Sequence, residues 1–426
     1  MDMGGEITMS AGGISIPLDV VTDILCSLPV KSVLRFKAVS KAWCSLIDSP
    51  DFARFHLSAS IETNDDLMLI ILTNHQRTGD DDNPGGVLCA DFYSLDDVEV
   101  DDDGDGGASS RLRQVRPRSC PFKPRKTCTY ALGSSCNGML AFGSYGGDLD
   151  FWNPTTNQCY STSVLDLDQS RYPQFMKFQL QRTTVFYQDT TCSSSSHDHQ
   201  YKLLQMQRVV QPNGGGSICQ LRSYNLEANG FTTFLTLSDE SAAGQNHDMR
   251  LALHSQCCFV NGALHWFVSS DGASHEWFRS DLGIEVFALH LGTLECYKLP
   301  FPFGAKYGRG TTLMVLGGSL CATFTDFEND TKGYAVDVWV MKEYGGEWTK
   351  LLNFTTKLIR GIYHTCVYPI AYSQSRDKVL LHFRHPYDSL WWYHLKQEKL
   401  IPVRIPGAPK FFQPRLCLPS FVNYQC

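Results

Sequence analysis

The sequence predicts an α+β protein of more than one domain: a small all-α helical module at residues 14–58, followed by an all-β, propeller-like domain of about six blades at residues 66–426. Three observations predict this fold class. Apolar residues recur at helical spacing in the first segment, and after Leu57 short apolar runs alternate with turn residues. A hairpin marked by an aromatic residue then recurs along the rest of the chain. Residues 1–13 are Gly-rich and polar, and we expect them to form a flexible N-terminus.

The composition supports a large folded core and excludes several classes of function. Hydrophobic residues make up 43% and charged residues 19% of the 426 residues, which argues against wholesale disorder. The net charge of −7 offers no basic footprint for nucleic acid. No apolar run approaches membrane-spanning length, and residues 1–13 lack the regions of a signal peptide. We therefore expect a cytoplasmic or nuclear protein that binds neither nucleic acid nor membrane.

The 16 cysteines fit that compartment as reduced, mostly buried small hydrophobes. None form a Cys-x-x-Cys pair, and Cys128 and Cys136 are too far apart for a zinc knuckle. His197-Asp198-His199 offers donor atoms, but it follows a run of serines and is interpreted as a solvated loop. The sequence therefore predicts neither a metal nor a cofactor.

The helical module is predicted from the spacing of its apolar residues and from the prolines and serines at the expected helix ends. Apolar residues at i, i+3, i+4 and i+7 form one face of a helix over residues 21–28. Pro17 suits its first turn, and Pro29 ends it and opens the next helix. Ser40 is a candidate N-cap for a third helix, and Ser49 with Pro50 starts a last short turn. The apolar stripes of the later segments are Val30, Val33 and Leu34, then Val39, Trp43, Leu46 and Ile47, then Phe52 and Phe55.

So short a segment cannot bury all of these side chains among its own helices. We expect part of the following set to stay available for a partner: Leu18, Ile24, Leu25, Leu28, Val33, Leu34 and Trp43. The alternative is a helical cap that packs on the domain that follows. Periodicity alone favours neither interpretation.

This stretch also resembles an F-box. The residues that carry the resemblance are Ile16-Pro17, Ile24-Leu25-Cys26-Ser27-Leu28-Pro29, Val30-Lys31-Ser32-Val33, Val39-Ser40-Lys41-Ala42-Trp43, Phe52 and His56-Leu57. Ile16 and Val33 each replace a usual Leu, and Ala38 stands where Cys is common. The resemblance implies docking on a Skp-family adaptor, and through it on the cullin and RING subunits of an SCF-type ubiquitin ligase. The residues it implies for adaptor binding are Pro17, Leu18, Ile24, Leu25, Leu28, Pro29, Val33, Leu34, Val39 and Trp43.

The β domain begins with two apolar runs, residues 67–73 and 87–93, that predict buried strands. The acidic run at residues 96–107 is interpreted as a solvated, disordered loop. A basic segment, residues 111–126, follows and is interpreted as a surface loop. Transient pairing of the two segments, or contact with a charged substrate, is the alternative.

From residue 129 onward, a tight-turn dipeptide followed by a short apolar strand recurs as Asn137-Gly138, Asn261-Gly262 and Gly317-Gly318. Hairpins centred on an aromatic residue recur as well, with Tyr93, Trp152, Tyr224, Phe287, Trp339 and Tyr393 as markers. Intervals of roughly 50 to 70 residues are typical of four-stranded propeller blades with inserted loops. A two-sheet β-sandwich is the alternative, but it does not explain a repeating marker. Residues 421–424 are the candidate for a strand that closes the ring on the first blade.

The same region resembles the F-box-associated domain of plant F-box proteins, which is related to kelch propellers. Cys136-Asn137-Gly138-Met139-Leu140 and Phe151-Trp152-Asn153-Pro154-Thr155-Thr156 carry this resemblance. The Gly-Gly, Tyr and Trp set of true kelch blades does not recur, so the domain is kelch-like. The resemblance implies a substrate receptor that holds a target protein on its propeller.

No Gly-x-Ser-x-Gly elbow, Walker loop or His-Glu-x-x-His helix occurs in the sequence. We therefore expect a non-catalytic specificity subunit, with proximity supplied by the complex. The alternative is a propeller lectin, or another glycan-binding protein, whose N-terminal helices only cap the fold. Its candidate binding residues are Trp266, Trp339, Trp391 and Trp392, although such residues more often form blade core. The sequence identifies neither the substrate nor the loops that bind it.

Overall fold

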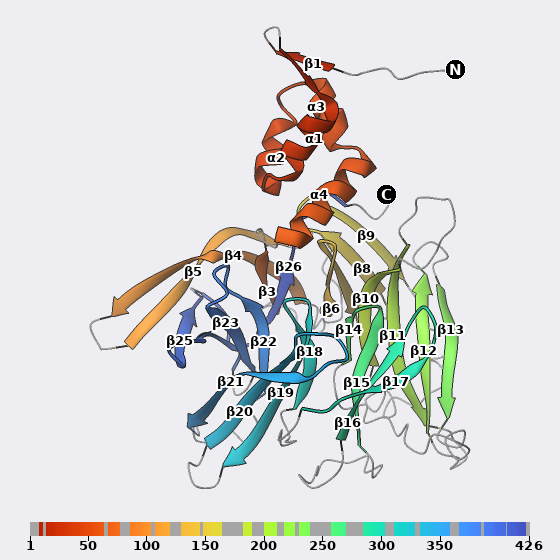
Figure 1. The fold of residues 1–426 in the computed structure, drawn as a ribbon, viewed down its shortest axis with the longest axis vertical. Coiled ribbons are helices and arrows are strands. Elements are labelled where there is room, and N and C mark those ends of the chain that lie inside the picture. Colours follow the sequence, from red (N-terminus) through yellow and green to blue (C-terminus); the bar gives the residue numbers. More distant parts are fainter. Residues whose placement is uncertain are drawn as a thin grey trace.

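A helical module stands on one face of a β-propeller in the computed structural model (Figure 1). The structure describes residues 8–11, 14–63, 67–76, 86–103, 107–119, 129–144, 148–163, 182–189, 200–210, 217–225, 230–238, 257–269, 284–302, 311–328, 333–357, 366–384, 387–405 and 407–422. His197-Asp198-His199 lies outside these residues. In the described part of the chain, every helix is too short or too polar to serve as a membrane span.

The module contains the predicted helices, in the predicted order. They are α1 (Leu18–Cys26), α2 (Val30–Phe36), α3 (Lys41–Ile47) and α4 (Pro50–Thr63), preceded by a hairpin of β1 (Thr8–Ala11) and β2 (Ile14–Pro17). Pro17 and Pro29 occupy the N-cap positions of α1 and α2. The Ser40 Oγ accepts a hydrogen bond from the Trp43 backbone N–H at 3.1 Å, which confirms the predicted N-cap of α3.

Two predictions at the ends of the module need correction. Thr8–Ala11 pairs with Ile14–Pro17, so part of the expected flexible lead is a strand. The last helix is 14 residues long rather than a short turn, and it extends past residue 58. The Ser49 Oγ caps its first turn by accepting from the Phe52 N–H at 3.2 Å. The length of α4 matters because this helix connects the module to the propeller (Figure 1).

The β domain is a propeller of six four-stranded blades in the part of the chain that the structure describes, and the outermost strands of the first and sixth blades pair to join these two blades in one eight-stranded sheet. From the centre outwards, the first blade consists of β26 (Gln413–Cys417), β3 (Met68–Gln76), β4 (Gly86–Asp103) and β5 (Gly107–Ser119). The second and third blades are β6 (Thr129–Cys136), β7 (Met139–Ser144), β8 (Asp148–Asn153) and β9 (Gln158–Ser163), then β10 (Arg182–Asp189), β11 (Gln200–Val210), β12 (Ser217–Asn225) and β13 (Gly230–Ser238). The fourth and fifth are β14 (Cys258–Val260), β15 (Ala263–Ser269), β16 (Ile284–His290) and β17 (Cys296–Leu299), then β18 (Thr312–Leu316), β19 (Ser319–Glu328), β20 (Gly333–Met341) and β21 (Trp348–Lys357). The sixth is β22 (Cys366–Tyr372), β23 (Lys378–Arg384), β24 (Ser389–His394) and β25 (Lys399–Arg404).

The aromatic markers all occupy the same strand of their blades, which explains why they recur. Tyr93, Trp152, Tyr224, Phe287, Trp339 and Tyr393 lie on β4, β8, β12, β16, β20 and β24, the third strand of each blade. The tight-turn dipeptides connect first and second strands, and Asn137 (φ 50°) and Gly138 (φ 80°) show the positive φ values of such turns. The propeller prediction is therefore confirmed, and the sandwich alternative is wrong.

The ring closes through a strand that the sequence analysis did not identify. Gln413–Cys417 pairs antiparallel with the first blade, from Gln413 opposite Leu72 to Cys417 opposite Met68. The predicted closing segment, residues 421–424, lies further along the chain: its first two residues pack beneath the helical module, and residues 423–424 fall outside the described part. Closing with the C-terminal strand as the innermost strand ties the two ends of the domain together.

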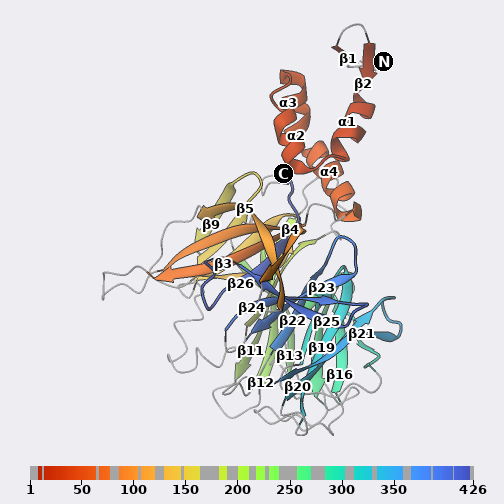
Figure 2. The same ribbon diagram turned by 90° about the vertical axis from the view of Figure 1, so that its left-hand side faces the viewer.

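The acidic run is a strand, not a disordered loop. Residues 96–103 continue β4 and pair with β5, from Val98 opposite Leu112 to Asp103 opposite Gly107. This long hairpin projects from the first blade in Figure 1 and again in Figure 2, in orange. Residues 111–119 of the basic segment form its second strand, so the two charged segments lie side by side in the backbone register. Residues 104–106 and 120–126 fall outside the described part.

The cysteines are less buried than predicted. The eleven cysteines whose side chains the structure describes are free thiols, and among these eleven only Cys321 and Cys417 are buried. Cys159 and Cys296 are exposed, and the others are half-buried.

Candidate functional site

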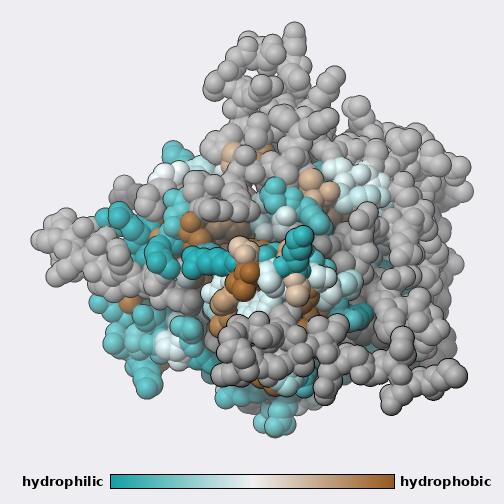
Figure 3. Space-filling model, turned by 90° about the horizontal axis from the view of Figure 1, so that it is seen from above, coloured by the Kyte–Doolittle hydropathy of each residue, from teal (hydrophilic) through white to brown (hydrophobic). Residues whose placement is uncertain are grey.

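The first candidate site is the outer surface of the helical module, because it leaves large apolar side chains in water. Val39 is 59% exposed and Ile24 is 52% exposed, and Val20, Leu34, Pro17 and Pro29 are exposed with them. Figure 3 looks down on the molecule from the module side, where hydrophobic side chains lie among hydrophilic ones near the centre of the face. We define these six residues as the apolar surface of the module. A group of exposed apolar side chains on so small a module is typical of a protein-binding surface.

The ten residues that the F-box resemblance implied for adaptor binding divide into three groups. Pro17, Ile24, Pro29, Leu34 and Val39 are exposed, whereas Leu18, Leu28 and Trp43 are half-buried. Leu25 and Val33 are buried in the core shared with the neighbouring helices, so their side chains stabilise the module instead of facing a partner.

Val20 was missed because helix α1 carries apolar residues on two faces. Val21 and Leu25 face the core, whereas Val20 and Ile24, one helical turn apart, face solvent. The sequence did contain a signal, since a helix that is apolar on both sides has more apolar surface than one core can cover. An interpretation that assigns a single apolar face to α1 does not identify this second, exposed apolar face.

Charged groups hold the ends of α2 and α3 together beside the apolar surface. Lys37 forms an ion pair with Asp48, and the Cys44 thiol lies 3.3 Å from the other carboxylate oxygen of Asp48. The hydrogen bond from Lys37 lowers the pKa of the Asp48 carboxyl, and the bond to Asp48 raises the pKa of the Cys44 thiol. Asp48 is exposed and Lys37 is partly exposed, so this ion pair orients the helices more than it stabilises them.

A C-terminal segment, residues 418–422, joins the module to the propeller, and we call it the C-terminal tail. The Phe421 ring lies 5.9 Å from the ring of Phe52 and 5.1 Å from that of His56, both on α4. His56 donates from Nε2 to the Leu28 carbonyl at 2.9 Å, which fixes α4 against the end of α1. One hydrophobic cluster therefore runs from the helices through Phe421 and Val422 into the second and third blades.

The residues that carried the second family resemblance form the socket of this tail. The Asn153 Nδ2 donates to the carbonyls of Ser420 and Val422, at 3.0 and 2.7 Å, while its Oδ1 accepts from the Thr155 N–H at 2.8 Å. A Cβ added at Gly138, where φ is +80°, would lie 2.6 Å from the Leu418 carbonyl oxygen. Asn153 and Gly138 thus serve to seat the tail, a role that the sequence pattern did not indicate.

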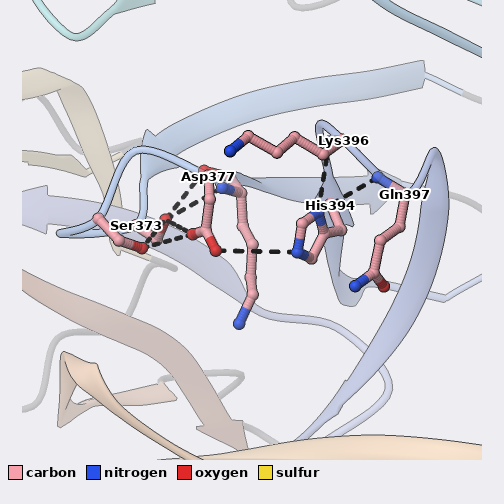
Figure 4. A network of polar contacts seen from close by, with 7 residues as sticks. Ser373, Asp377, His394, Lys396 and Gln397 are labelled. Carbon is pink, nitrogen blue, oxygen red and sulfur yellow. Dashed lines mark hydrogen bonds and ion pairs between the residues drawn. The ribbon is translucent and has the colours of Figure 1, made fainter.

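A polar network on the sixth blade connects the β22–β23 turn with the β24–β25 turn (Figure 4). Ser373 donates to the Asp377 carboxylate at 2.8 Å, and the other oxygen of Asp377 lies 3.8 Å from Nε2 of His394. The His394 Nδ1 accepts from the backbone N–H groups of Lys396 and Gln397. Because these polar atoms bond one another, the network holds the turns in place and presents no free nucleophile.

A buried histidine connects the fourth and fifth blades. The Tyr344 hydroxyl lies 2.6 Å from Nε2 of His265 and 2.7 Å from the Tyr297 hydroxyl. Burial lowers the pKa of His265 to about 4 and raises the pKa of Tyr344. A neutral imidazole without access to solvent is suited to a structural role. Among the described residues, no group of three His, Cys, Asp or Glu side chains is placed to hold a metal ion.

The four tryptophans of the glycan-binding alternative do not form a common surface. Trp266 and Trp392 are buried in their blades, and Trp339 and Trp391 are half-buried. The aromatic ring of Trp339 is covered by Lys350, whose Nζ lies 5.0 Å from the ring centroid. The first two side chains therefore form blade core, as the competing interpretation predicts.

Comparisons with known proteins match both domains. A family model described as "F-box domain" matches residues 14–55, and one described as "F-box associated beta propeller domain" matches residues 111–424. The "F-box protein CPR1" of Arabidopsis thaliana is 27% identical, over 96% of this chain and 89% of that protein. An "F-box/kelch-repeat protein" of the same plant is 26% identical, over 80% of this chain and 79% of its own length. The solved structure of YjhT covers 77% of this chain and 95% of its own, at 10% identity and a TM-score of 0.35, a likeness too weak to bear on function.

Proposed function

This chain belongs to the family of F-box proteins with an F-box-associated β-propeller domain, and from that membership we propose that it is the substrate-recognition subunit of an SCF-type cullin–RING ubiquitin ligase. The module binds a Skp-family adaptor, which links it to the cullin and RING subunits. The propeller binds a protein substrate. The chain itself is non-catalytic: it raises the local concentration of substrate lysines near a ubiquitin-loaded enzyme. We place this complex in the cytoplasm or the nucleus.

The apolar surface of the module is the observation that carries this proposal. If the helices were only a cap, side chains such as Ile24 and Val39 would face the propeller, yet they are more than half exposed. The propeller contacts the opposite side of the module, through α4 and the C-terminal tail. A partner that covers Ile24, Leu34 and Val39 would remove apolar area from water, which is the main source of affinity at such interfaces.

The rigid connection between module and propeller supports the same function. A substrate receptor must hold its target at a fixed distance from the ligase, because productive transfer depends on orientation as well as proximity. The tail provides this rigidity: Phe421 contacts α4 on one side, and Asn153 of the second blade holds the tail's carbonyls on the other.

Binding of the full chain to a purified Skp-family adaptor, measured by titration calorimetry, tests the proposal. The variant Ile24→Asp with Val39→Asp places two charges on the apolar surface and should weaken binding by about 100-fold or more. Both side chains are exposed, so thermal unfolding should be nearly unchanged.

The matched control is Phe411→Asp, which places the same charge on an exposed apolar residue of the propeller. It should leave adaptor binding unchanged. The assignment is wrong if the folded wild-type chain does not bind the adaptor, or if the double variant binds it as tightly as the wild type.

A further inference from the structure

The propeller face away from the module carries its own exposed aromatic residues. Strands in a blade alternate in direction, so the connections β23–β24 and β25–β26 emerge at the opposite end from the β22–β23 turn. The equivalent turn of the second blade, Asn137-Gly138, contacts the tail beneath the module. Residues 387–388 and 407–412 therefore lie on the far face, the one open to a substrate held away from the adaptor.

Two aromatic rings are exposed together on this face. Phe411 is 66% exposed and Tyr387 is 47% exposed, and their ring centroids are 5.9 Å apart in an edge-to-face arrangement. The Lys410 Nζ lies 4.8 Å from the Tyr387 ring centroid, a cation–π contact. Among the described residues of the propeller, the other aromatic side chains are buried or half-buried, so an exposed pair beside a cation is an exception that calls for a partner.

The connections that present these rings are fixed in place. The Asp388 carboxylate accepts from Nε2 of His382 at 2.7 Å and from the Phe412 N–H at 2.9 Å. The Asp388 N–H donates to the Lys410 carbonyl at 2.9 Å, which ties one connection to the other. A surface that is already ordered loses less entropy when a ligand binds.

The described residues place two more cations, Arg384 and Arg415, close to His382, whose ring contacts that of Phe412 next to Phe411. Arg384 ends β23 opposite Cys366, and Arg415 lies on the innermost strand, β26. The Arg415 Nη1 donates to the Pro414 carbonyl, but its Nε is buried without a hydrogen-bond partner. Burial and the nearby Arg384 lower the pKa of Arg415 to about 10, so the Arg415 guanidinium is still charged at neutral pH.

Asp388, the acid close to these side chains in the described part of the chain, is already engaged. Asp388 is bonded to His382 and to the Phe412 backbone, and neither Arg384, Lys410 nor Arg415 forms an ion pair within the described ranges. The whole chain carries a net charge of −7, whereas the described residues around these rings, Arg384, Lys410 and Arg415 with Asp388, are net positive, which is a local reversal of sign. Such a reversal attracts an acidic ligand to one place and repels it elsewhere.

We propose that this far-face patch, formed by Arg384, Tyr387, Lys410, Phe411 and Arg415, binds an acidic peptide segment of the protein substrate that carries an apolar side chain among its carboxylates. The carboxylates pair with the cations, and the apolar side chain packs on the rings of Tyr387 and Phe411. The inference rests on the proposed function, since it names the substrate class of that receptor. The patch combines an aromatic anchor with Arg, a composition enriched in protein-binding hot spots.

The test is selection from an immobilised library of short random peptides by the full chain bound to its adaptor. Peptides retained by the wild type should be enriched in Asp and Glu with at least one aromatic or aliphatic residue, and their retention should fall as salt is raised. The variant Arg384→Glu with Lys410→Glu should lose this enrichment by about tenfold or more, and Phe411→Ser should weaken it by removing the apolar contact. All three changed positions are exposed, so folding should be preserved.

The controls separate this inference from the adaptor assignment. The charge-reversed variant should bind the adaptor as the wild type does, because the module is unchanged. The variant Ile24→Asp with Val39→Asp, tested alone, should lose the adaptor yet still select acidic peptides. The inference is overturned if wild-type pools are no more acidic than the input library, or if the charge-reversed variant selects the same peptides.

Discussion

The helical module and the propeller place their apolar side chains in opposite ways. The propeller buries large aromatic residues on the third strand of its blades, with Trp152, Tyr224 and Tyr393 almost fully enclosed. The module leaves Ile24, Leu34 and Val39 exposed within four helices. The reason is size: a unit of about 50 residues has too much surface relative to its volume to bury every apolar side chain, whereas a ring of six blades does not. Apolar residues thus form the core of the propeller, whereas on the module some of them stay exposed, where we propose that they bind the adaptor.

The comparison extends to how we propose that each region recognises a partner. The module offers a helical surface whose apolar residues can be read from the sequence by their spacing. In the propeller, the large side chains of the strands pack in the core. A binding surface there is therefore formed by the connections between strands, which expose residues such as Tyr387 and Phe411. The predictions below test how cleanly this division holds.

The largest effect should come from emptying the core of one blade. Trp392 on β24 is buried, and Trp392→Ala should lower the free energy of unfolding by about 3–5 kcal/mol, because it leaves a cavity that the neighbouring sheets cannot fill. Urea unfolding followed by fluorescence or circular dichroism measures this change.

Trp391, the next residue on the same strand, is the matched control for that experiment. Its side chain is half-buried, with Nε1 donating to Ser389 at 3.2 Å, so Trp391→Ala should cost clearly less. Equal losses at the two positions would contradict the assignment of one tryptophan to the core and the other to the blade surface.

The second effect concerns a buried polar side chain of the propeller. The pKa of His265 is about 4 in the folded protein and about 6.5 in the unfolded protein. Between these two pH values the unfolded state binds a proton at this histidine and the folded state does not, so the free energy of unfolding falls as the pH is lowered. The contribution of neutral His265 to the free energy of unfolding is fully present above about pH 6.5. It is lost as the pH falls towards 4, by about 3 kcal/mol in total.

Unfolding free energies measured from pH 7 to pH 4 test this expectation. His265→Gln should flatten the acid slope, even though it lowers stability at pH 7, because no group at that position then takes up a proton. His290→Gln, at a half-buried position on the next strand, is the control and should keep the slope. An unchanged slope in His265→Gln would show that other groups, such as the buried His382, account for acid sensitivity.

Much of the fold could be predicted from the sequence because its signals are local. Proline positions and the Ser40 cap located the helices, and the repeated Asn-Gly turns and aromatic markers located the blades. These features depend on φ preferences, capping and burial within a few residues, which a sequence displays directly.

The errors have a different origin, since each depends on a pairing partner that composition does not reveal, whether that partner is near in the chain or far away. The acidic residues 96–103 form a strand because β5 pairs with them, and composition alone suggested a loop. The closing strand, Gln413–Cys417, is defined by its pairing with β3, more than 300 residues earlier. The far-face patch was also missed, because Arg384, Lys410 and Arg415 come together only when the first and sixth blades meet.

The third prediction asks whether module and propeller behave as one body. Asn153→Ala removes two hydrogen bonds to the carbonyls of Ser420 and Val422, and should cost about 1–3 kcal/mol because those buried acceptors lose their donor. Hydrogen–deuterium exchange should become faster in residues 418–422 and in α4, while the fourth to sixth blades keep their protection. Gln158→Ala, exposed on the same hairpin, is the control. Unchanged exchange in α4 would mean that the tail does not couple the two regions.

The smallest effect on stability should come from the apolar surface of the module, and it is the sharpest test of the comparison. Val39 is already in water, so Val39→Ser should change the free energy of unfolding by no more than about 0.5 kcal/mol, whereas it should weaken adaptor binding measurably. Val33→Ala, buried on α2, should do the reverse: it should destabilise the module while leaving the surface that faces the adaptor intact. If Val39→Ser lowers the free energy of unfolding as much as Val33→Ala does, then the Val39 side chain is buried in solution and is not part of an adaptor-binding surface.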